Sequence, residues 1–302
     1  MKILFASRSE KPELWLPLLR QSLPRDEIVA VPDKSVDIAL VATPPEGTFQ
    51  KLGRPKLIQS LWMGVEKLLA DPTLPRGVPL ARLVDPGMVA AMSETVLVHV
   101  LDWHRHLYRY RLQQRGSTWK REEQRMASDR TIGLLGLGEL GSDAAQKLVT
   151  LGFNVAGWSR RPKDIPGVRS FTDLDSMLRI TDALVCLLPL TAETQGILNA
   201  RTFSMLKRGG CVINLARGGH VVVPDLLRAL DSGWLAHAYL DVFETEPLPS
   251  KDPLWNHPGI TITPHVAALT EPRTAVPKVI DNIERVRRGD TPMNLVDFQA
   301  GY

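Results

Sequence analysis

The sequence of 302 residues has little of what marks secreted or membrane-spanning proteins. Its two cysteines, Cys186 and Cys211, lie in apolar, strand-like segments, and two cysteines in a chain of this size do not make a disulfide framework. No apolar run approaches the ~20 residues that a membrane span needs. The apolar run in the N-terminal MKILFASRSE is too short for a signal peptide. We therefore expect a protein of a reducing compartment, the cytoplasm, with no membrane partner.

Charge of one sign is in only slight excess, since 37 Lys and Arg residues stand against 33 Asp and Glu residues. The resulting net charge of +4 suits an anionic substrate or cofactor and does not require nucleic acid. The basic stretch 104–125 is the candidate nucleic-acid surface. No zinc-finger or RNA-binding motif accompanies it, so we interpret it as an exposed, solvated helix. We predict no nucleic-acid partner and no metal site.

What the sequence does contain is an alternation of short apolar strands with helices, which is typical of a parallel α/β sheet. The first strand candidates are residues 2–7, 27–31, 37–43, 56–60 and 81–85, with helices at 12–23 and near 65–70. A long helix is predicted from about Met88 to Gln114. Its apolar face is formed by Val96, Val100, Trp103 and Leu107, which recur at three-to-four-residue spacing.

A second alternation begins at Thr131. Its strand candidates are residues 131–136, 154–158, 183–188, 211–216, 236–242 and 259–265. Helices are predicted between several of these strands, and a final helix is predicted at 275–289. The economical interpretation is two α/β domains hinged near the long helix.

A glycine-rich turn follows the first strand of the second series. Gly136, Gly138 and Gly141 form G-x-G-x-x-G, in which the glycines allow a tight turn, close approach of a pyrophosphate and close packing of helix and strand. Glu139 and Leu140 open the following helix, whose N-terminus faces the phosphate charge. The pattern is weak by itself, but its strand–turn–helix–strand context predicts dinucleotide binding.

The end of the next strand lacks the acidic residue expected of an NAD-binding protein. That residue would hydrogen-bond the ribose hydroxyls, but GWSRRPK offers Trp158, Ser159, Arg160 and Arg161 instead. A carboxylate would repel a 2′-phosphate, whereas arginine donors match it. A solvated basic loop is the alternative, which we favour for Lys163 alone. The predicted cofactor is NADP(H), with NAD(H) used more weakly.

Polar residues also follow three strands of the second series, where ligands gather in open α/β sheets. They are Arg217, Asp241, Glu244, Glu246 and His265. Arginine suits a carboxylate and a carbonyl oxygen, and histidine paired with a carboxylate suits a proton donor near neutral pH. Each residue alone would be unremarkable. Their combination behind a dinucleotide-binding turn indicates an active site.

These motifs resemble the D-isomer-specific 2-hydroxyacid dehydrogenase family over nearly the whole chain. The shared motifs are GLGELG, LPLTAETQGIL, NLARGG, LDVFETEPLP and TPHVAALT. Within the family, the chain resembles the bacterial glyoxylate/hydroxypyruvate reductase A group. The features shared with that group are SLWMGVEKLLADPTLP, DPGMVAAMSETVL, GWSRRPK and a closing GY.

The resemblance implies two Rossmann-like or flavodoxin-like α/β domains with parallel sheets and an active site in the interdomain cleft. Residues 1–98 and 272–302 would form a discontinuous substrate-binding domain, and residues 99–271 the dinucleotide-binding domain. It also implies a homodimer, with the basic stretch 104–125 in the interdomain and dimer region.

The resemblance assigns Arg217, Glu246 and His265 as the catalytic set, with Glu246 chosen over Glu244 because it precedes the proline of E-P-L. It implies that further residues line the cofactor: Leu188, Pro189, Thr194, Leu215, Ala216 and, near the nicotinamide, Asp241. The substrate loop would be Trp62, Met63, Gly64 and Val65, with backbone amides that bind a carboxylate. The bulk of Trp62 and Met63 either narrows the site or is packed core, and the sequence leaves both open.

The expected reaction is NADPH-dependent reduction of small 2-keto acids: glyoxylate to glycolate and hydroxypyruvate to D-glycerate. Hydride would reach the carbonyl carbon while His265 protonates the oxygen, Glu246 favours the charged imidazole, and Arg217 binds the carboxylate and polarises the carbonyl. Two alternatives stay open. One is a reductase of bulkier 2-keto acids such as phenylpyruvate, and the other is a nucleotide-sensing, non-catalytic binding protein.

Overall fold

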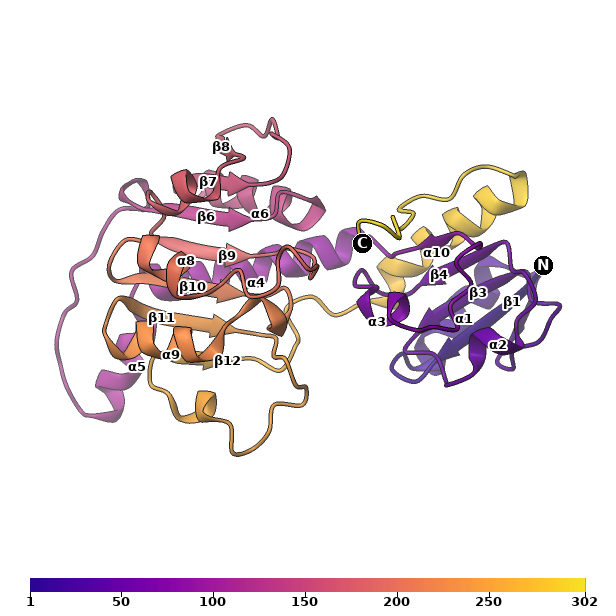
Figure 1. Ribbon diagram of the computed structural model, residues 1–302, viewed down its shortest axis with the longest axis horizontal. Helices are drawn as coiled ribbons and strands as arrows, with labels where there is room; N and C mark the ends of the chain where they lie inside the picture. The colour runs from indigo at the N-terminus through magenta and orange to yellow at the C-terminus, as the bar shows by residue number, and fades with distance from the viewer. Residues whose placement is uncertain (302) are drawn as a thin grey trace. The chain divides into compact units, whose positions relative to one another are not determined.

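The computed structural model describes residues 1–301, and Tyr302 of the closing GY lies outside the described residues. The chain divides into two compact units (Figure 1). Unit 1 is Met1–Met88 with the segment that starts at Leu269, and unit 2 is Val89–Ala268. The sequence suggested boundaries at 98/99 and 271/272. The structure divides the chain at 88/89 because α4 (Pro86–His104) packs into the core of unit 2 from Met92 onward.

Unit 1 contains a five-stranded parallel sheet. Its strands are β1 (Lys2–Ser7), β2 (Glu27–Val29), β3 (Ile38–Ala42), β4 (Leu57–Ser60) and β5 (Leu80–Ala81). Their spatial order is β2-β1-β3-β4-β5, which is the flavodoxin-like order. In such a sheet, ligands bind outside the carboxyl ends of the strands.

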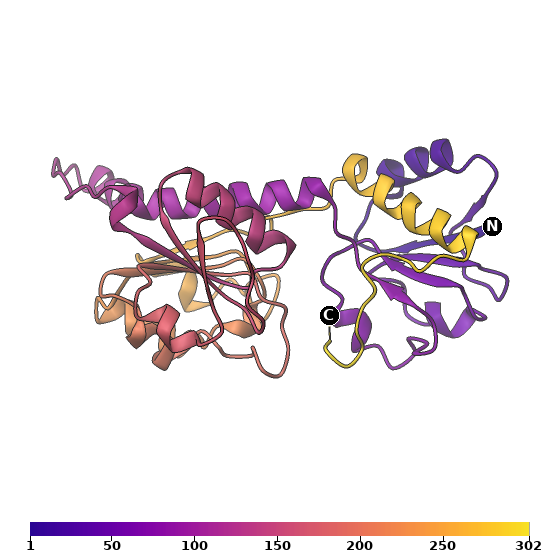
Figure 2. The same cartoon turned by 90° about the horizontal axis from the view of Figure 1, so that it is seen from above.

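Helices cover both faces of the unit 1 sheet. They are α1 (Pro12–Ser22), α2 (Thr48–Lys51), α3 (Glu66–Leu69) and α10 (Pro272–Arg288). Successive residues of a strand point to opposite faces. Ile3 and Phe5 therefore pack with α1 and α10, while Leu4 and Ala6 belong to the core that contains α2 and α3. The C-terminal helix α10, drawn in yellow, thus completes the first unit (Figure 2).

Unit 2 contains a seven-stranded parallel sheet. Its strands are β6 (Thr131–Leu135), β7 (Asn154–Trp158), β8 (Val168–Phe171), β9 (Ala183–Cys186), β10 (Gly210–Asn214), β11 (Leu235–Leu240) and β12 (Ile260–Ile262). The order β12-β11-β10-β9-β6-β7-β8 is that of a Rossmann sheet extended by one strand. All strands are parallel, and the order in which the chain adds them reverses between β6 and β9. The α/β fold class with two parallel sheets is confirmed.

Six helices accompany this sheet: α4, α5 (Leu107–Arg115), α6 (Glu139–Thr150), α7 (Leu174–Leu178), α8 (Ala200–Met205) and α9 (Val223–Asp231). Figure 2 shows α4 above the sheet and the orange helices below it. In β6, Ile132 and Leu134 face α4 and α6. Leu135 faces the other way and joins the core between the sheet and α7, α8 and α9. The glycine-rich turn is thereby held between two packed helical layers.

The long helix predicted over 88–114 is in fact two helices. α4 ends at His104, His106 adopts a left-handed conformation with φ of 59°, and α5 begins at Leu107. Val96, Val100 and Trp103 are buried as predicted, but Leu107 is 47 % exposed because the turn takes it off the apolar face of α4. The exposed helix predicted over 104–125 is likewise reduced to α5, and no helix covers residues 118–126.

One strand and one α-helix of unit 2 escaped prediction from the sequence. The edge strand β8 has the sequence VRSF and is only partly buried, so it lacks the apolar run that marks an inner strand. α7 has five residues, too few for a helical repeat to be recognised. Both lie between the second and third strand candidates of the second series.

The described residues contain no helix long and apolar enough to cross a membrane, and no cluster of metal-ligating side chains. Both cysteines are free and buried. Burial raises the pKa of the Cys186 thiol to about 12. Because the thiolate is the reactive form, Cys186 is an inert core residue.

The fold predicts that α10 stabilises unit 1. Replacing Ile283, which is fully buried, with alanine should lower the free energy of unfolding by about 2–5 kcal/mol, because it leaves a cavity. Urea unfolding measures this. Lys278→Ala, at an exposed position of the same helix, is the matched control and should change stability by less than about 0.5 kcal/mol. Equal effects of the two substitutions would contradict the packing of α10.

Candidate active site

The carboxyl ends of the strands in unit 2 lie in register. Leu135 pairs with Trp158 on one side and with Cys186 on the other. Asn214, at the end of β10, pairs with Leu240, which pairs with Ile262. The segments that follow these strands therefore share one edge of the sheet. This edge carries every site residue that the sequence predicts in unit 2.

The glycine-rich turn has the geometry of a phosphate cradle. Gly136 has φ of +99°, and a Cβ on Gly141 would lie 1.9 Å from the Gly136 carbonyl oxygen, so both positions require glycine. A Cβ on Gly138 would meet nothing within 4 Å, which leaves open space in front of the helix. The first hydrogen bond of α6 runs from Ser142 N–H to the Gly138 carbonyl. The N–H groups of Glu139 and Leu140 precede it at the helix terminus, where a phosphate can accept them.

The segment after β7, which carries Arg160 and Arg161, lies directly beside this turn. The Gly136 N–H donates to the Trp158 carbonyl over 3.0 Å, and the Trp158 indole N–H donates to the Thr172 carbonyl. The Ser159 hydroxyl donates to the Arg161 carbonyl over 2.6 Å, which bends the chain after β7. Arg160 and Arg161 are exposed. Two exposed guanidinium groups beside a phosphate cradle can hold an additional phosphate.

The segments after β9 and β10 offer mainly backbone groups. The Thr194 hydroxyl donates to the Pro189 carbonyl over 2.7 Å and is therefore committed to its own loop. The side chains of Leu188, Leu215 and Ala216 are buried in the cores of unit 2. A cofactor at this edge would meet the main chain of these three residues rather than their side chains.

His265 and Glu246 form the polar pair predicted from the motifs. His265 Nδ1 lies 2.8 Å from Glu246 Oε2, and the Phe243 N–H donates to Glu246 Oε1 over 2.9 Å. Glu246 is thus fixed by its own loop and orients the ring. The His265 side chain is half exposed, so its Nε2 can reach a ligand. Glu244 is exposed, and the carboxylate bonded to the imidazole is that of Glu246.

Asp241 holds the segment that carries His265. Its carboxylate is buried and accepts hydrogen bonds from the Thr263 hydroxyl and from the N–H groups of Val266 and Ala267. The His265 N–H donates to the Asp241 carbonyl over 2.8 Å. His265 has a positive φ of 54°, an uncommon conformation that surrounding structure must maintain. The contacts described for the Asp241 carboxylate thus support the segment that carries His265.

Arg217 follows β10 and precedes a short 3-10 helix, Gly218–His220. Its guanidinium Nη1 donates to the Ala216 carbonyl over 2.7 Å. A Cβ on Gly218 would lie 1.9 Å from the carbonyl carbon of Phe243, so the Arg217 segment presses against the loop that carries Glu246. The structure therefore gathers Arg217, Glu246 and His265 from three neighbouring strand ends.

Two buried polar residues of this edge escaped prediction. The Asn214 side-chain amide donates to the Arg217 carbonyl over 2.9 Å and accepts from the Ala216 N–H. His220 is fully buried, with Nδ1 next to the Arg217 main chain and Nε2 3.3 Å from the Pro189 carbonyl. Both flank the Arg217 motif in the sequence. A polar residue that ends an apolar strand was the signal that could have revealed Asn214.

The predicted substrate loop lies in unit 1, after β4. The Trp62 indole packs against the core of α1 and α10, and its N–H donates to Glu10 Oε1 over 2.7 Å. The Val65 side chain is buried, so only its main chain is available to a ligand. Met63 and Gly64 are partly exposed. Trp62 is also partly exposed, but it is anchored against this core, and Met63 is not part of the core.

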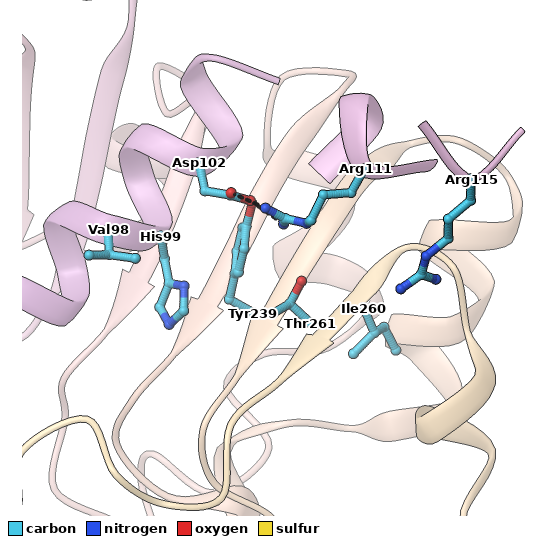
Figure 3. Close-up of a pocket in the computed structure, with 8 residues that line it drawn as sticks. All are labelled: Val98, His99, Asp102, Arg111, Arg115, Tyr239, Ile260 and Thr261. Carbon is cyan, nitrogen blue, oxygen red and sulfur yellow. Dashed lines mark hydrogen bonds and ion pairs between the residues drawn. The ribbon is translucent and has the colours of Figure 1, made fainter. Parts of the chain in front are cut away.

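A separate pocket of about 400 Å³ opens on unit 2 and shares no residue with this site (Figure 3). It is lined by Val98, His99, Asp102, Arg111, Arg115, Tyr239, Ile260 and Thr261. Both terminal guanidinium nitrogens of Arg111 donate to Asp102, which also accepts from the Tyr239 hydroxyl. Burial raises the pKa of Tyr239 and lowers that of His99. Both groups are therefore uncharged at neutral pH.

Comparison with known proteins identifies the family. Residues 97–267 match the model of the D-isomer-specific 2-hydroxyacid dehydrogenase NAD-binding domain. The chain is 44 % identical to glyoxylate/hydroxypyruvate reductase A of Serratia proteamaculans, with 100 % of both sequences covered. It is 41 % identical to the protein of that name from Yersinia enterocolitica, with the same coverage.

Solved structures agree with this assignment. A D-isomer-specific 2-hydroxyacid dehydrogenase from Xanthobacter autotrophicus, crystallised with NADPH and MES, matches with a TM-score of 0.95 and 39 % identity, covering 100 % of this chain and 99 % of that one. An NADPH-dependent glyoxylate/hydroxypyruvate reductase from Sinorhizobium meliloti, crystallised with NADP and sulfate, matches with a TM-score of 0.94 and 37 % identity at the same coverage. The resemblance found in the motifs is confirmed, and the chain belongs to the D-isomer-specific 2-hydroxyacid dehydrogenase family.

Proposed function

We propose that this enzyme reduces glyoxylate to glycolate and hydroxypyruvate to D-glycerate with NADPH. The observation that carries the proposal is the 2.8 Å pair of His265 and Glu246, set beside Arg217 on the sheet edge that also bears the phosphate cradle. The relatives named for this activity match over the full length of the chain. The intact polar set argues against a binding protein without chemistry, because nucleotide sensing alone would need neither a proton donor nor its carboxylate partner.

The cofactor proposal rests on the segment after β7. Arg160 and Arg161 stand where an NAD-specific protein would carry an acid, and they are exposed beside the glycine-rich turn. Guanidinium groups favour a 2′-phosphate by charge and by hydrogen-bond geometry. Structural neighbours of this chain were crystallised with NADPH or NADP. We assign NADP(H) as the preferred cofactor and NAD(H) as a weaker one.

The residues of unit 2 divide the reaction between them. When bound, the reduced nicotinamide supplies a hydride to the carbonyl carbon. His265 in its charged form donates a proton to the carbonyl oxygen, so one hydride and one proton complete the alcohol. Glu246 orients the ring through its contact with Nδ1. Arg217 binds the carboxylate and polarises the carbonyl, which stabilises the negative charge that develops on oxygen.

Substrate size is assigned to the loop after β4. The main-chain amides of Met63, Gly64 and Val65 would bind the substrate carboxylate, and the side chains of Trp62 and Met63 would limit the group on the other side of the carbonyl. A hydrogen or a hydroxymethyl group fits such a limit better than a benzyl group. The alternative function, reduction of bulkier 2-keto acids, would require this loop to leave space for a large group beside the carbonyl.

We also propose a homodimer that acts in the cytoplasm, and we assign its interface to α4, α5 and the following segment. Exposed large apolar side chains are concentrated there: Val98, Leu101, Leu107, Leu112, Trp119 and Met126. Trp119 is 97 % exposed. Exposed apolar side chains that gather on a surface mark sites of protein association.

The first experiment measures steady-state oxidation of NADPH with glyoxylate, hydroxypyruvate and phenylpyruvate. We expect kcat/KM for both short acids to exceed that for phenylpyruvate, and NADPH to exceed NADH by at least about tenfold, or about 1.4 kcal/mol. Larger acids should be slow rather than inert, because each lost methylene of space costs about 1–3 kcal/mol. A higher kcat/KM for phenylpyruvate would overturn the substrate assignment.

The same assay tests the arginines. The double substitution of Arg160 and Arg161 by alanine should weaken NADPH use and leave NADH use nearly intact, because NADH lacks the 2′-phosphate. The matched control is Arg179→Ala, which removes a cation from an exposed position elsewhere in unit 2. Equal use of the two cofactors by the unmodified enzyme would refute this assignment.

The proton donor has its own test. His265→Ala should lower kcat by about two to four orders of magnitude while NADPH still binds. Glu246→Gln keeps the size of the side chain but replaces the carboxylate that contacts Nδ1 and holds the ring, so kcat should fall while NADPH still binds. The Asp231→Asn variant, which alters an exposed carboxylate beside His257, should leave kcat unchanged. A kcat that Glu246→Gln does not alter would refute the role of Glu246 in orienting the ring.

The dimer is tested by sedimentation equilibrium. Val98→Glu, at a position 62 % exposed on α4, should weaken association by about 2–5 kcal/mol, because it would bury an unpaired charge. Val31→Glu, at a position 73 % exposed in unit 1, is the control and should leave the mass unchanged. A parent enzyme that sediments as a monomer would exclude the dimer.

A further inference from the structure

We propose that Glu10 is a positioning residue that fixes the Trp62 indole as a rigid wall of the acceptor site and so sets the size of the 2-keto acid. This inference rests on the proposed function. Glu10 lies in none of the motifs that mark the family. The structure alone connects it to the substrate loop, through the 2.7 Å hydrogen bond from Trp62 Nε1.

Glu10 holds two indoles at once. Its Oε1 accepts from Trp62, and its Oε2 accepts from Trp15 Nε1 over 2.8 Å. Trp15 is fully buried in α1, so the second bond ties the carboxylate to the core of unit 1. An indole has a single N–H donor. Each bond therefore fixes the direction of its ring. Through Glu10, Trp62 is held in a fixed position relative to the buried Trp15.

We call the Glu10 carboxylate with its two indole partners the clamp. The main chain of Glu10 and of Trp62 is also fixed. The Glu10 N–H donates to the Ser7 hydroxyl over 2.6 Å, which shapes the loop after β1. The Trp62 N–H donates to the Ser60 hydroxyl, and the Trp62 carbonyl accepts from the Leu83 N–H. Neither end of the Glu10–Trp62 bond can drift without breaking these contacts.

The clamp spans the edge of the sheet where ligands bind. Glu10 follows β1 and Trp62 follows β4, and β3 lies between these two strands. All three are parallel, so their carboxyl ends meet at one edge, the side on which open α/β sheets bind their ligands. Met63 and Gly64 follow Trp62 directly. A fixed indole at this place limits the space next to the main-chain amides of the loop.

The physical consequence concerns selectivity. A mobile tryptophan would swing aside for a benzyl group at the cost of one rotamer change, whereas the clamped ring must first break a hydrogen bond to a charged acceptor. Hydrogen bonds to charged groups are stronger than neutral ones. Weakening the clamp should therefore relax discrimination against large acceptors more than it affects small ones.

The experiment compares kcat/KM for phenylpyruvate and glyoxylate with NADPH. Glu10→Gln keeps the size of the side chain but places an amide N–H against one of the two indole N–H groups. Trp62→Phe removes the donor and retains an aromatic ring. Each should raise the phenylpyruvate-to-glyoxylate ratio by about tenfold. Glu13→Gln, an exposed glutamate on α1, should leave it unchanged.

Because the ratio is taken within one preparation, a loss of folded protein cancels, and a purely structural role of Glu10 would not move it. The Glu10→Gln, Trp62→Phe double variant should show little more change than either single variant, since both act on one bond. If the parent is active and both single variants keep the parent's phenylpyruvate-to-glyoxylate ratio, the clamp alone is overturned. A parent without activity on either acid would overturn the proposed function, and the clamp with it.

Discussion

The buried carboxylate of Asp241 is the point on which the arrangement of unit 2 depends. It lies at the end of β11 and accepts three hydrogen bonds from the segment that follows β12. A buried charge is tolerated only when donors satisfy it. The 263–267 segment supplies these donors and in return is held in place. His265 can therefore keep a left-handed backbone and still present Nδ1 to Glu246.

Contacts to the backbone also hold Arg217 in place. Gly218 lies so close to Phe243 that no side chain would fit between them, and Asn214 and His220 bond the main chain around Arg217. The guanidinium, the imidazole and the carboxylate are thus supplied by loops that support one another. Parallel strands in register make this possible, because their carboxyl ends deliver successive loops to one edge.

The sequence predicted much of the fold because the inner strands of a parallel sheet are continuous apolar runs. β6, β9 and β10 are recognisable for that reason. β8 is not, since it is a partly exposed edge strand. The break between α4 and α5 also escaped prediction, because the periodicity of apolar residues continues past His106 while the backbone turns there. Local patterns report burial well and report a single residue of unusual conformation poorly.

For the site, the residue types and their order in the sequence were enough to indicate the dinucleotide turn, the arginines beside it and a group of polar residues after three strands, from which the family resemblance selected Arg217, Glu246 and His265. These features are local: a glycine pattern, a missing acid, a polar residue after a strand. Tertiary structure decided what depends on distant partners. It brought the carboxylate of Glu246, which the family motif had already singled out, to His265 Nδ1, and it committed Asp241 to the 263–267 segment. It also joined Glu10 to Trp62 across 52 residues of sequence, because a hydrogen bond is set by the meeting of two chain segments and leaves no pattern in either one.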